Sequence, residues 1–568
     1  MKKNLLILLS AAILSLSFAA ISFATDPLLQ QSDLTYMGAF RVPQTGSSCA
    51  SFQYGGRSVA FNPVNNSLFL TGSTACDEVA EISIPTPICL DGGGNAVSCA
   101  TYTPPTNATG SLGNLNTAAV LQNFADITEG NSYNICQNSN CSGNGTVNTG
   151  LLVYNGELIG DTKAYYDALD KQIYSHFTNS TNLLTNSFSG YYELNTGLFA
   201  GLSPGPMTVI PAAYQSQLGG KVLTGQGPGT GIVTTLSYGP CAIAFDPANM
   251  VPSNLPSKTV PATVLAYYNA PHPLPGGQWA GDQAANPYTS PADSIGGVVF
   301  PDGTRSVLYF GVHGKASTDG YACYGAGTSS LAATYADACP AGIGTCQYSE
   351  RLVGFAGTVT SGTFISGETV TQAGTNATGT LVRLDPRAGL EFLKSSAPQG
   401  ANTAGVWTGQ TSKATFAPTP GGIVGDEVCY DPADSSKGVH AYPYVNYVWA
   451  YDVGNPNGTN TTGNNVNSLS ATNPGENNLT AVKLGLIQPY EVIPYATWTF
   501  TLPTGASQLV PGNFSGATWD PVHSRIYVTQ KNADKSAYAS FPLVHVFQVA
   551  VKSSATALPT VTGLSLVN

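Results

Sequence analysis

The feature that most constrains this chain is a short phrase that occurs near both of its ends. Residues 61–72 read FNPVNNSLFLTG and residues 519–530 read WDPVHSRIYVTQ. Each phrase combines an aromatic strand end, an Asx-Pro turn and an alternating strand, because proline fixes φ and the Asx side chain can bond the backbone ahead of it. Degenerate copies occur at 245–247, 300–303 and 430–432. A strand–turn–strand unit repeated along 568 residues predicts a β-propeller.

The amino terminus has the pattern of a secretory signal. Lys2 and Lys3 precede an apolar run from Leu5 to about Ala20, and residues 22–24 provide a small-residue cleavage pattern. We expect cleavage after this pattern, so that residues 1–24 are a signal peptide; an uncleaved anchor is the alternative. No cysteine follows the run, which disfavours a lipoprotein, and no later segment is long and apolar enough to span a bilayer. The expected location is secreted, periplasmic or cell surface.

The composition argues against several kinds of partner. Only 9% of the residues are charged, and the formal net charge is −11, or −13 once Lys2 and Lys3 are removed. No basic stripe offsets phosphate charge, so nucleic acid is not an expected partner, and the same repulsion counts against a polyanionic glycan. A hydrophobic content of 42% argues against disorder. These numbers favour a folded β protein whose surface carries amides and hydroxyls.

All eleven cysteines lie beyond the signal, and disulfides are the default interpretation in an exported protein. Because the count is odd, at least one thiol stays unpaired or shared, and Cys241 is the candidate. Metal binding is the alternative, but the sequence has no C-x-x-C and no paired histidine spacing. The expected pairs are Cys136–Cys141, Cys339–Cys346 and Cys323–Cys429.

Two shorter segments carry local signals. Residues 150–159 read GLLVYNGELI, a hairpin with an Asn-Gly turn. Residues 163–177 are compatible with a short helix.

Residues 354–418 differ from their surroundings. They include GTVTSGTFISGETVT at 357–371, NATGTLV at 376–382 and a looser echo at 406–416. This segment resembles the β repeats of phage structural and bacterial surface proteins, which implies a small inserted β module; a long decorated hairpin inside one blade is the alternative. The expected organisation is a propeller formed by 25–353 and 419–568 that is interrupted by this module.

The rest of the chain also resembles a known family. The matching phrases are DLTYMGAFR at 33–41, GVHG at 311–314 with CYG at 323–325, and HAYPY at 440–444 leading to VWAYD at 448–452. They are similar to a family of exported bacterial proteins that are predicted propellers without a characterised function. The resemblance implies a fold and no activity.

One group of residues is a candidate for acid–base chemistry. A Cys323–Cys429 bridge would bring its loops together. An imidazole, a phenol and a cation around one cavity could then remove a proton α to a carboxylate while Arg305 neutralises that carboxylate, as in some propeller polysaccharide lyases. Hydrogen bonding to loop backbones around a disulfide is the alternative. The group comprises His313, Tyr324, Tyr430, Asp431, Lys437 and His440.

Glycoside hydrolysis would instead require two carboxylates within about 5 to 10 Å of each other. A single aspartate in a loop rich in glycine and proline is more often a turn former than a catalytic residue. The adjacent Asp426 and Glu427 are therefore a better candidate than any single carboxylate, and they are the first pair to test. The other carboxylates in expected rim loops are Asp282, Asp293 and Asp431. The aromatic residues that could stack on sugar faces are Trp279, Tyr288, Tyr444 and Trp449.

Two further motifs are weaker. GLSPG at 201–205 matches a serine hydrolase elbow, but Pro204 lacks the N–H that the oxyanion would need. DVGNPNG at 452–458 offers oxygen ligands without the EF-hand pattern, so calcium is conceivable but unsupported. No metal site and no other cofactor is expected.

The sequence therefore predicts an all-β fold: a β-propeller of roughly six to eight blades with a small inserted β module, closed by strands from both termini. The leading functional hypothesis is binding of an extracellular ligand, a carbohydrate, in adhesion or recognition. The alternatives are a glycan-degrading enzyme, either a polysaccharide lyase or a glycoside hydrolase acting in the propeller cavity, and a structural protein of a surface layer or filament. The expected partner is an extracellular glycan or surface polymer.

Overall fold

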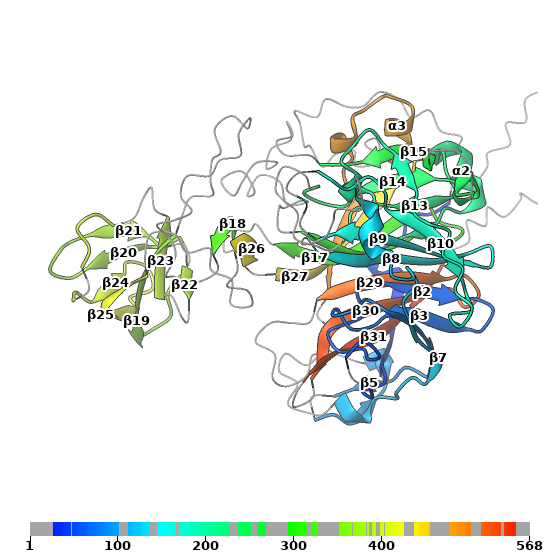
Figure 1. The fold of residues 1–568 in the computed structure, drawn as a ribbon. Coiled ribbons are helices and arrows are strands. Elements are labelled where there is room, and N and C mark those ends of the chain that lie inside the picture. The colour runs from blue at the N-terminus through cyan, green and yellow to red at the C-terminus, as the bar shows by residue number, and fades with distance from the viewer. Residues whose placement is uncertain are drawn as a thin grey trace, which may run out of the picture.

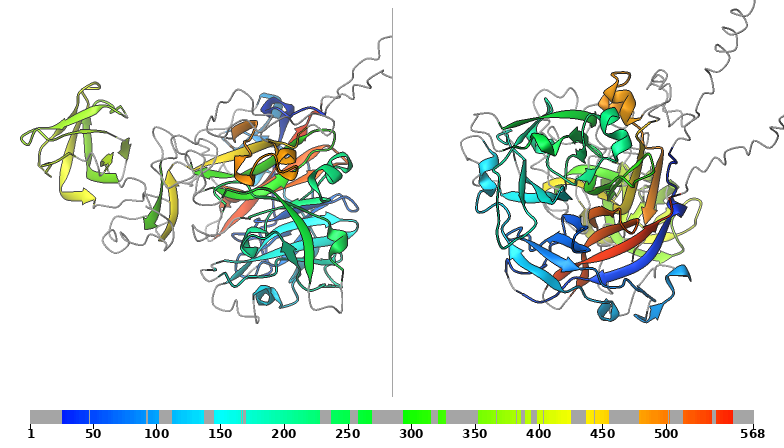
Figure 2. Two further views of the ribbon diagram at one scale, coloured as in Figure 1. Left: turned by 90° about the horizontal axis from the view of Figure 1, so that it is seen from above. Right: turned by 90° about the vertical axis from the view of Figure 1, so that its right-hand side faces the viewer.

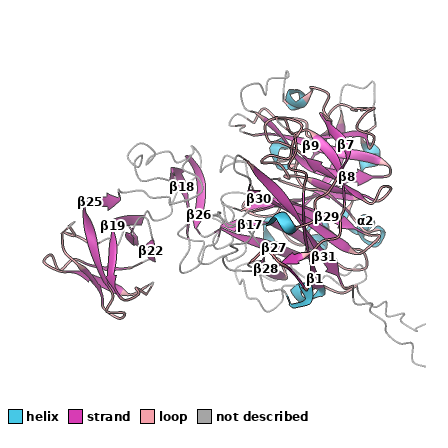
Figure 3. Ribbon diagram, turned by 90° about the horizontal axis from the view of Figure 1, so that it is seen from below, coloured by secondary structure: helices cyan, strands magenta, loops and turns pink. Residues whose placement is uncertain are grey.

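Strands dominate the fold, as Figure 1 and Figure 3 show. The α-helices among the described residues are α2 (Ala212–Leu218) and α3 (Leu479–Lys483). The sequence prediction of an all-β protein is thereby confirmed.

The computed structural model describes residues 26–551, apart from short breaks and the stretches 102–111, 137–144, 228–236, 252–257, 269–292, 315–320, 327–351, 425–436, 455–477 and 503–512. The expected signal peptide, residues 1–24, lies outside the described residues.

The repeated phrase forms hairpins by the mechanism that its residues predict. Strands β2 (Val59–Asn62) and β3 (Ser67–Thr71) pair antiparallel, and Asn62 Oδ1 accepts the backbone N–H of Val64 at 3.1 Å. The second copy builds β29 (Phe514–Asp520) and β30 (Arg525–Lys535) in the same way. There Asp520 Oδ1 accepts the backbone N–H groups of Val522 and His523, at 2.9 and 3.0 Å. Each Asx side chain therefore closes the turn that joins two strands.

These hairpins belong to two blades of four antiparallel strands each. The first blade is the sheet β2–β3–β4–β7, and the fifth blade is β29–β30–β31–β1, which a single parallel bridge joins to the fourth blade in one eight-stranded sheet. Because β1 comes from the amino-terminal part and pairs with β31, the last strand among the described residues, the two ends of the propeller close one blade together, as the sequence predicts. The additional bounds are β4 (Val79–Ser83), β7 (Val120–Ala125), β31 (Ser540–Val549) and β1 (Leu34–Arg41).

Three further blades lie between these two along the chain. The second blade consists of β8 (Thr146–Tyr154), β9 (Glu157–Ala164) and β10 (His176–Ser180). The third consists of β12 (Thr208–Val209), β13 (Val222–Thr224), β14 (Ala242–Phe245) and β15 (Thr259–Ala266), with β11 (Glu193–Asn195) parallel to β15 at its edge. The fourth consists of β16 (Ser294–Val299), β17 (Ser306–Gly314), β27 (Tyr444–Asp452) and β28 (Ala496–Phe500).

The first strands of the blades meet around an axis. Strand β2 contacts β29 and β8, β29 contacts β16, and β16 contacts β12. The second and third blades share a core cluster that includes Leu152 and Val222, which completes the ring. The right-hand view of Figure 2 shows the blue, cyan, green and red sheets arranged around this body. When the two halves of the eight-stranded sheet are counted separately, the described residues form five blades, so the roughly six to eight blades expected from the sequence are not confirmed. A long insertion in the fourth blade takes up much of the chain.

The propeller core consists of apolar side chains packed between neighbouring blades. Phe61 of the first blade shares a cluster with Tyr527 and Val544 of the fifth. Phe310 of the fourth blade shares another with Val528 of the fifth. Burial between blades therefore holds the ring together, since each sheet alone would leave both faces exposed to water.

In the second blade, one sequence prediction is confirmed and another is wrong. The turn Asn155-Gly156, with φ of 50° and 83°, joins β8 to β9 as predicted. The helix expected at 163–177 does not form, because β9 continues to Ala164 and β10 begins at His176. Pairing with neighbouring strands outweighs the weak helical preference of this segment.

The two ends of the propeller differ in what they carry. We define the insertion face as the end at which β2, β8, β16 and β29 begin and β3, β9, β17 and β30 end. The opposite end, the hairpin face, carries the tight turns between these pairs of strands. The long connection from β17 to β27 leaves from and returns to the insertion face.

That connection contains a sheet of its own. A ribbon of β18 (Tyr321–Ala326) and β26 (Lys437–Tyr442) comes first, and Figure 1 shows the seven-stranded sheet beyond it as a body apart from the propeller. Its core includes Phe355, Phe392 and Trp407. The module expected at 354–418 falls within this sheet. Its strands are β19 (Leu352–Ser361), β20 (Thr369–Gln372), β21 (Thr378–Thr380), β22 (Arg383–Asp385), β23 (Gly389–Leu393), β24 (Trp407–Gly409) and β25 (Thr415–Val424).

Two disulfides were not among the expected pairs. Cys49 bonds to Cys76, and Cys89 bonds to Cys99 beside the small hairpin of β5 (Cys89–Leu90) and β6 (Ala96–Val97). Cys241 is free and buried, as predicted. Cys136 is also disulfide-bonded. The other expected pairs involve residues that lie outside the described part, namely Cys141, Cys339, Cys346 and Cys429.

Candidate functional site

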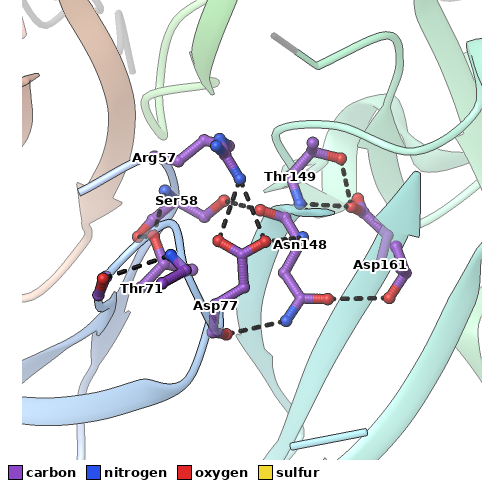
Figure 4. Close-up of polar contacts among 10 residues, drawn as sticks. Arg57, Ser58, Thr71, Asp77, Asn148, Thr149 and Asp161 are labelled. Atoms are coloured by element: carbon purple, nitrogen blue, oxygen red, sulfur yellow. Dashed lines mark hydrogen bonds and ion pairs between the residues drawn. The ribbon is translucent and has the colours of Figure 1, made fainter. Parts of the chain in front are cut away.

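Charged side chains gather on the insertion face where the first and second blades meet. Arg57, just before β2, donates from Nη1 to both carboxylate oxygens of Asp77, at 3.1 and 3.3 Å. Asn148 at the start of β8 donates its backbone N–H to Asp77 Oδ2 at 3.3 Å and its amide to the Asp77 carbonyl at 3.0 Å. Figure 4 shows Asp77 held between these two residues. The contacts tie a loop of one blade to the inner strand of the next.

The burial of Asp77 has an electrostatic consequence. Loss of water raises the pKa of its carboxyl to about 6, although the Arg57 charge and the hydrogen bond from Asn148 act in the opposite direction. Asp77, the carboxylate that pairs with Arg57, therefore changes its charge near pH 6.

A second carboxylate lies deeper between the second and third blades. Asp161 is fully buried and accepts the backbone N–H and hydroxyl of Thr149 on Oδ1, at 3.2 and 2.7 Å, and the N–H of Gly205 on Oδ2 at 2.7 Å. Burial raises the pKa of Asp161 to about 7 despite these donors. His176 Nε2 lies 3.9 Å from Asp161 Oδ2, but burial lowers the pKa of this imidazole to about 3 and keeps it neutral. The group stabilises the junction of the two blades.

Lys163 belongs to the same buried layer. Its Nζ donates to the carbonyl of Gly227 at 3.5 Å, and burial lowers its pKa to about 8 although Asp161 favours the charged form. A carboxyl and an amine that both titrate near neutrality are suited to proton transfer. Neither is exposed to solvent, so their evident role is to join β9 to the third blade.

The solvent-facing part of the face is formed by Arg57 and Lys531. Lys531 follows the second copy of the repeat in β30 and is exposed. Even so, the surrounding protein removes enough water to lower the pKa of its ammonium, and the Arg57 charge lowers it further. In the described part of the chain, Lys531 forms no ion pair with a carboxylate.

The sequence-predicted residue His313 lies on the same face, at the end of β17. Its Nδ1 is 2.6 Å from Asp293 Oδ1, and its ring stacks on Tyr447 with ring centroids 4.7 Å apart. The ring of Trp449 is perpendicular to that of His313, with ring centroids 5.9 Å apart. His313 is 2% exposed and Trp449 is 0% exposed. Trp449 is therefore a core residue, not the exposed sugar platform that the sequence analysis expected.

Arg305 and His313 do not come together. Arg305 immediately precedes β17 on the hairpin face and pairs with Asp452 at 3.1 Å, whereas His313 lies near the other end of the same strand. Eight residues of extended strand span about 26 Å. Arg305 therefore cannot neutralise a carboxylate bound beside His313, contrary to the arrangement that the sequence analysis expected.

The remaining candidates cannot be placed as side chains. Tyr324 lies in β18, His440 and Lys437 in β26, and Tyr444 at the start of β27, and of these only the backbone is described. Cys323 stands opposite His440 in the register of the ribbon. The candidates outside the described residues are Trp279, Asp282, Tyr288, Asp426, Glu427, Tyr430 and Asp431.

The sequence analysis missed the two cations Arg57 and Lys531 and the buried carboxylates Asp77 and Asp161. Arg57 precedes the first copy of the repeat and Lys531 follows the second, so both flank the phrase on which the fold prediction rested. In a chain with only 21 lysines and arginines, a cation flanking each copy of the repeat could have singled them out. Asp77 and Asp161 carried no such signal, because only tertiary packing buries them.

The described residues contain neither a cluster of metal-ligating side chains nor a helix that could span a membrane. No three histidine, cysteine, aspartate or glutamate side chains within that part come together as a metal site. None of the helices described there has the length and apolar character needed to cross a bilayer.

Comparison with known proteins adds little. No protein-family model and no curated protein matches this chain. Among solved structures, the chain is similar to one titled "Structure of Dos1 propeller", at 9% identity over 91% of this chain and 96% of that chain, with a TM-score of 0.23. A similarity of this size supports no argument about function, and the strand pairing described above is what defines the propeller.

Proposed function

We propose that this protein is an exported binding protein that holds an extracellular carbohydrate on the insertion face of its propeller. The observation that carries the proposal is the group of Arg57, Asp77, Asn148 and Lys531, in which Lys531 is exposed and Arg57 is partly exposed beside its polar partners. A few precisely placed polar groups orient the ligand in a small-molecule site. The connection that contains the inserted module leaves from the same face.

The composition supports a carbohydrate as the ligand class. Sugars present many hydroxyl groups, which are recognised by charged and amide side chains that donate and accept hydrogen bonds. Arg57 uses Nη1 for Asp77 and has further N–H donors, and Lys531 has three. Nucleic acid would meet an overall charge of −11.

A glycan-cleaving enzyme is the second candidate, and the His313–Asp293 hydrogen bond favours it. A carboxylate on Nδ1 fixes the tautomer of a histidine and orients it for acid–base work. Against this stand the burial of His313 and the separation of Arg305 from it. Binding therefore remains the leading proposal.

The test combines a glycan array with assays for cleavage. The purified exported protein should be retained by at least one glycan, and Arg57→Ala and Lys531→Ala should each weaken that retention about tenfold, the typical loss of one charged hydrogen bond. Lys221→Ala is the matched control, since Lys221 is a surface cation near the hairpin face that pairs with Asp246 at 2.8 Å. Retention that survives both insertion-face variants would contradict the proposed site. New reducing or unsaturated ends that disappear in His313→Ala would instead support the enzyme.

A further inference from the structure

We propose that Arg57 and Lys531 form a carboxylate subsite, and that the glycan bound on the insertion face therefore carries uronic acid units. This inference rests on the proposed function and deepens it by naming the class of sugar. Uronic acids place one carboxylate on each sugar ring, so they combine hydroxyl recognition with a single anionic group.

The fold holds Arg57 in place before any ligand arrives. The carbonyl of Gly56 accepts the hydroxyls of Ser515 and Thr529, both of the fifth blade, at 2.7 and 2.8 Å. At Gly55, a Cβ would approach the carbonyl oxygen of Gly72 to 2.4 Å, so the backbone beside Arg57 is packed without room for a side chain. A cation fixed in this way loses little entropy on binding an anion.

Lys531 extends from the neighbouring fifth blade toward the same place. Thr529, two residues earlier in β30, donates its hydroxyl to the carbonyl of Gly56, the residue before Arg57. The backbone that carries Lys531 therefore lies against the backbone that carries Arg57, and the charge of Arg57 lowers the pKa of the Lys531 ammonium. Arg57 lies in the loop before β2 of the first blade and Lys531 in β30 of the fifth, so the two cations come from different blades.

The positive charges of Arg57 and Lys531 are not balanced by the carboxylates around them. Asp77 is the carboxylate in contact with Arg57, and Lys531 has no carboxylate within ion-pair distance among the described residues. Two like charges in a partly desolvated place repel each other, and an anion between them relieves this repulsion. Burial also weakens the compensation by Asp77, because its carboxyl takes up a proton near pH 6. The missing partner of the pair is thus an anion supplied by the ligand.

The net negative charge of the chain does not forbid an acidic sugar. Charges farther away than about 8 Å are largely screened at physiological ionic strength, so the two nearby cations dominate at the subsite. Arginine pairs with carboxylates through a planar fork of N–H donors, which suits the planar carboxylate of one uronic acid unit.

The experiment compares one polymer in two charge states. Oligogalacturonate and its methyl ester have the same sugar rings, but the ester lacks the anionic charge. We expect the wild-type protein to bind the free acid about tenfold more tightly than the ester, and added NaCl to reduce this preference. Lys531→Met should show a clearly smaller preference for the acid, because Arg57 alone remains to pair with the carboxylate. Lys535→Met is the matched control, because it removes another exposed lysine from the same strand and should keep the preference.

Each outcome decides the inference. Equal binding of acid and ester by the wild-type protein overturns it, as does an undiminished preference in Lys531→Met or the absence of any binding to the acid. Neutral galactose oligomers that bind on the insertion face in these cases would leave the proposed function standing. If no glycan of the array binds either, the proposed function fails as well.

Discussion

Closure of the ring by the amino-terminal strand can be tested at Phe40 in β1. This side chain is 0% exposed and packs in the cluster that contains Phe61 of the first blade and Val544 of the fifth. Phe40→Ala should therefore loosen the junction between the first and last parts of the chain.

The magnitude follows from the burial. A phenyl side chain buries about 150 Å² or more, which corresponds to about 4 kcal/mol at about 25 cal/mol per Å². Measured Phe→Ala changes in cores fall at about 3–5 kcal/mol, which includes the cavity left behind. We expect the free energy of unfolding of the propeller to fall by this amount in Phe40→Ala.

Urea unfolding followed by tryptophan fluorescence gives the loss, and hydrogen exchange of the β1–β31 ladder locates it. Thr35→Ala is the control, since Thr35 is exposed on the same strand and its loss should change stability by less than about 0.5 kcal/mol. A loss below about 1 kcal/mol in Phe40→Ala, or unchanged exchange in β31, would refute closure through β1.

Two further predictions concern Asp77 and the inserted module. The folded pKa of Asp77, about 6, lies above its ordinary value of 3.8, so the folded state keeps a proton that the unfolded chain releases. Its contribution to stability is therefore present below about pH 4 and is lost as the pH rises to about 6, by up to about 3 kcal/mol. Since Asp77→Asn cannot titrate, the variant should gain stability relative to wild type between pH 4 and pH 6.5 in urea unfolding; a constant difference would contradict the burial argument. In the module, Trp407 is 0% exposed in a core made of module residues alone. Trp407→Ala should destabilise the module by about 3–5 kcal/mol without altering hydrogen exchange in the propeller, whereas Trp407→Phe should have a smaller effect. Loss of protection in the propeller blades would show that the two parts unfold together.

The local pattern of the sequence was sufficient for several elements. The Asx-Pro phrases at 61–72 and 519–530 and the Asn-Gly turn at 155–156 act through the backbone next to them, so no distant residue is needed to form their hairpins. The segment 163–177 was misjudged because its conformation depends on pairing between β9 and β10. The blade count was not confirmed, because repeat spacing does not reveal how much chain an insertion occupies.

The candidate site was less accessible to sequence reasoning. His313 was singled out for its residue type, but its partner Asp293 and its burial among aromatic rings follow from the packing of the fourth blade. Arg305 was grouped with it although the two lie toward opposite ends of one strand. Residue type suggests a chemistry, and only the direction of the strand decides which residues share a face of the propeller.

What the sequence determined by itself was the all-β character, the turn chemistry and a chain whose ends carry the same structural unit. The tertiary structure decided which charges meet. Arg57 and Lys531 are separated by most of the chain, and they become neighbours because β1 closes the ring and places the inner strands of the first and fifth blades side by side. The physical reason is that hydrogen bonding within a hairpin is local, whereas desolvation and charge proximity depend on every element packed around a group.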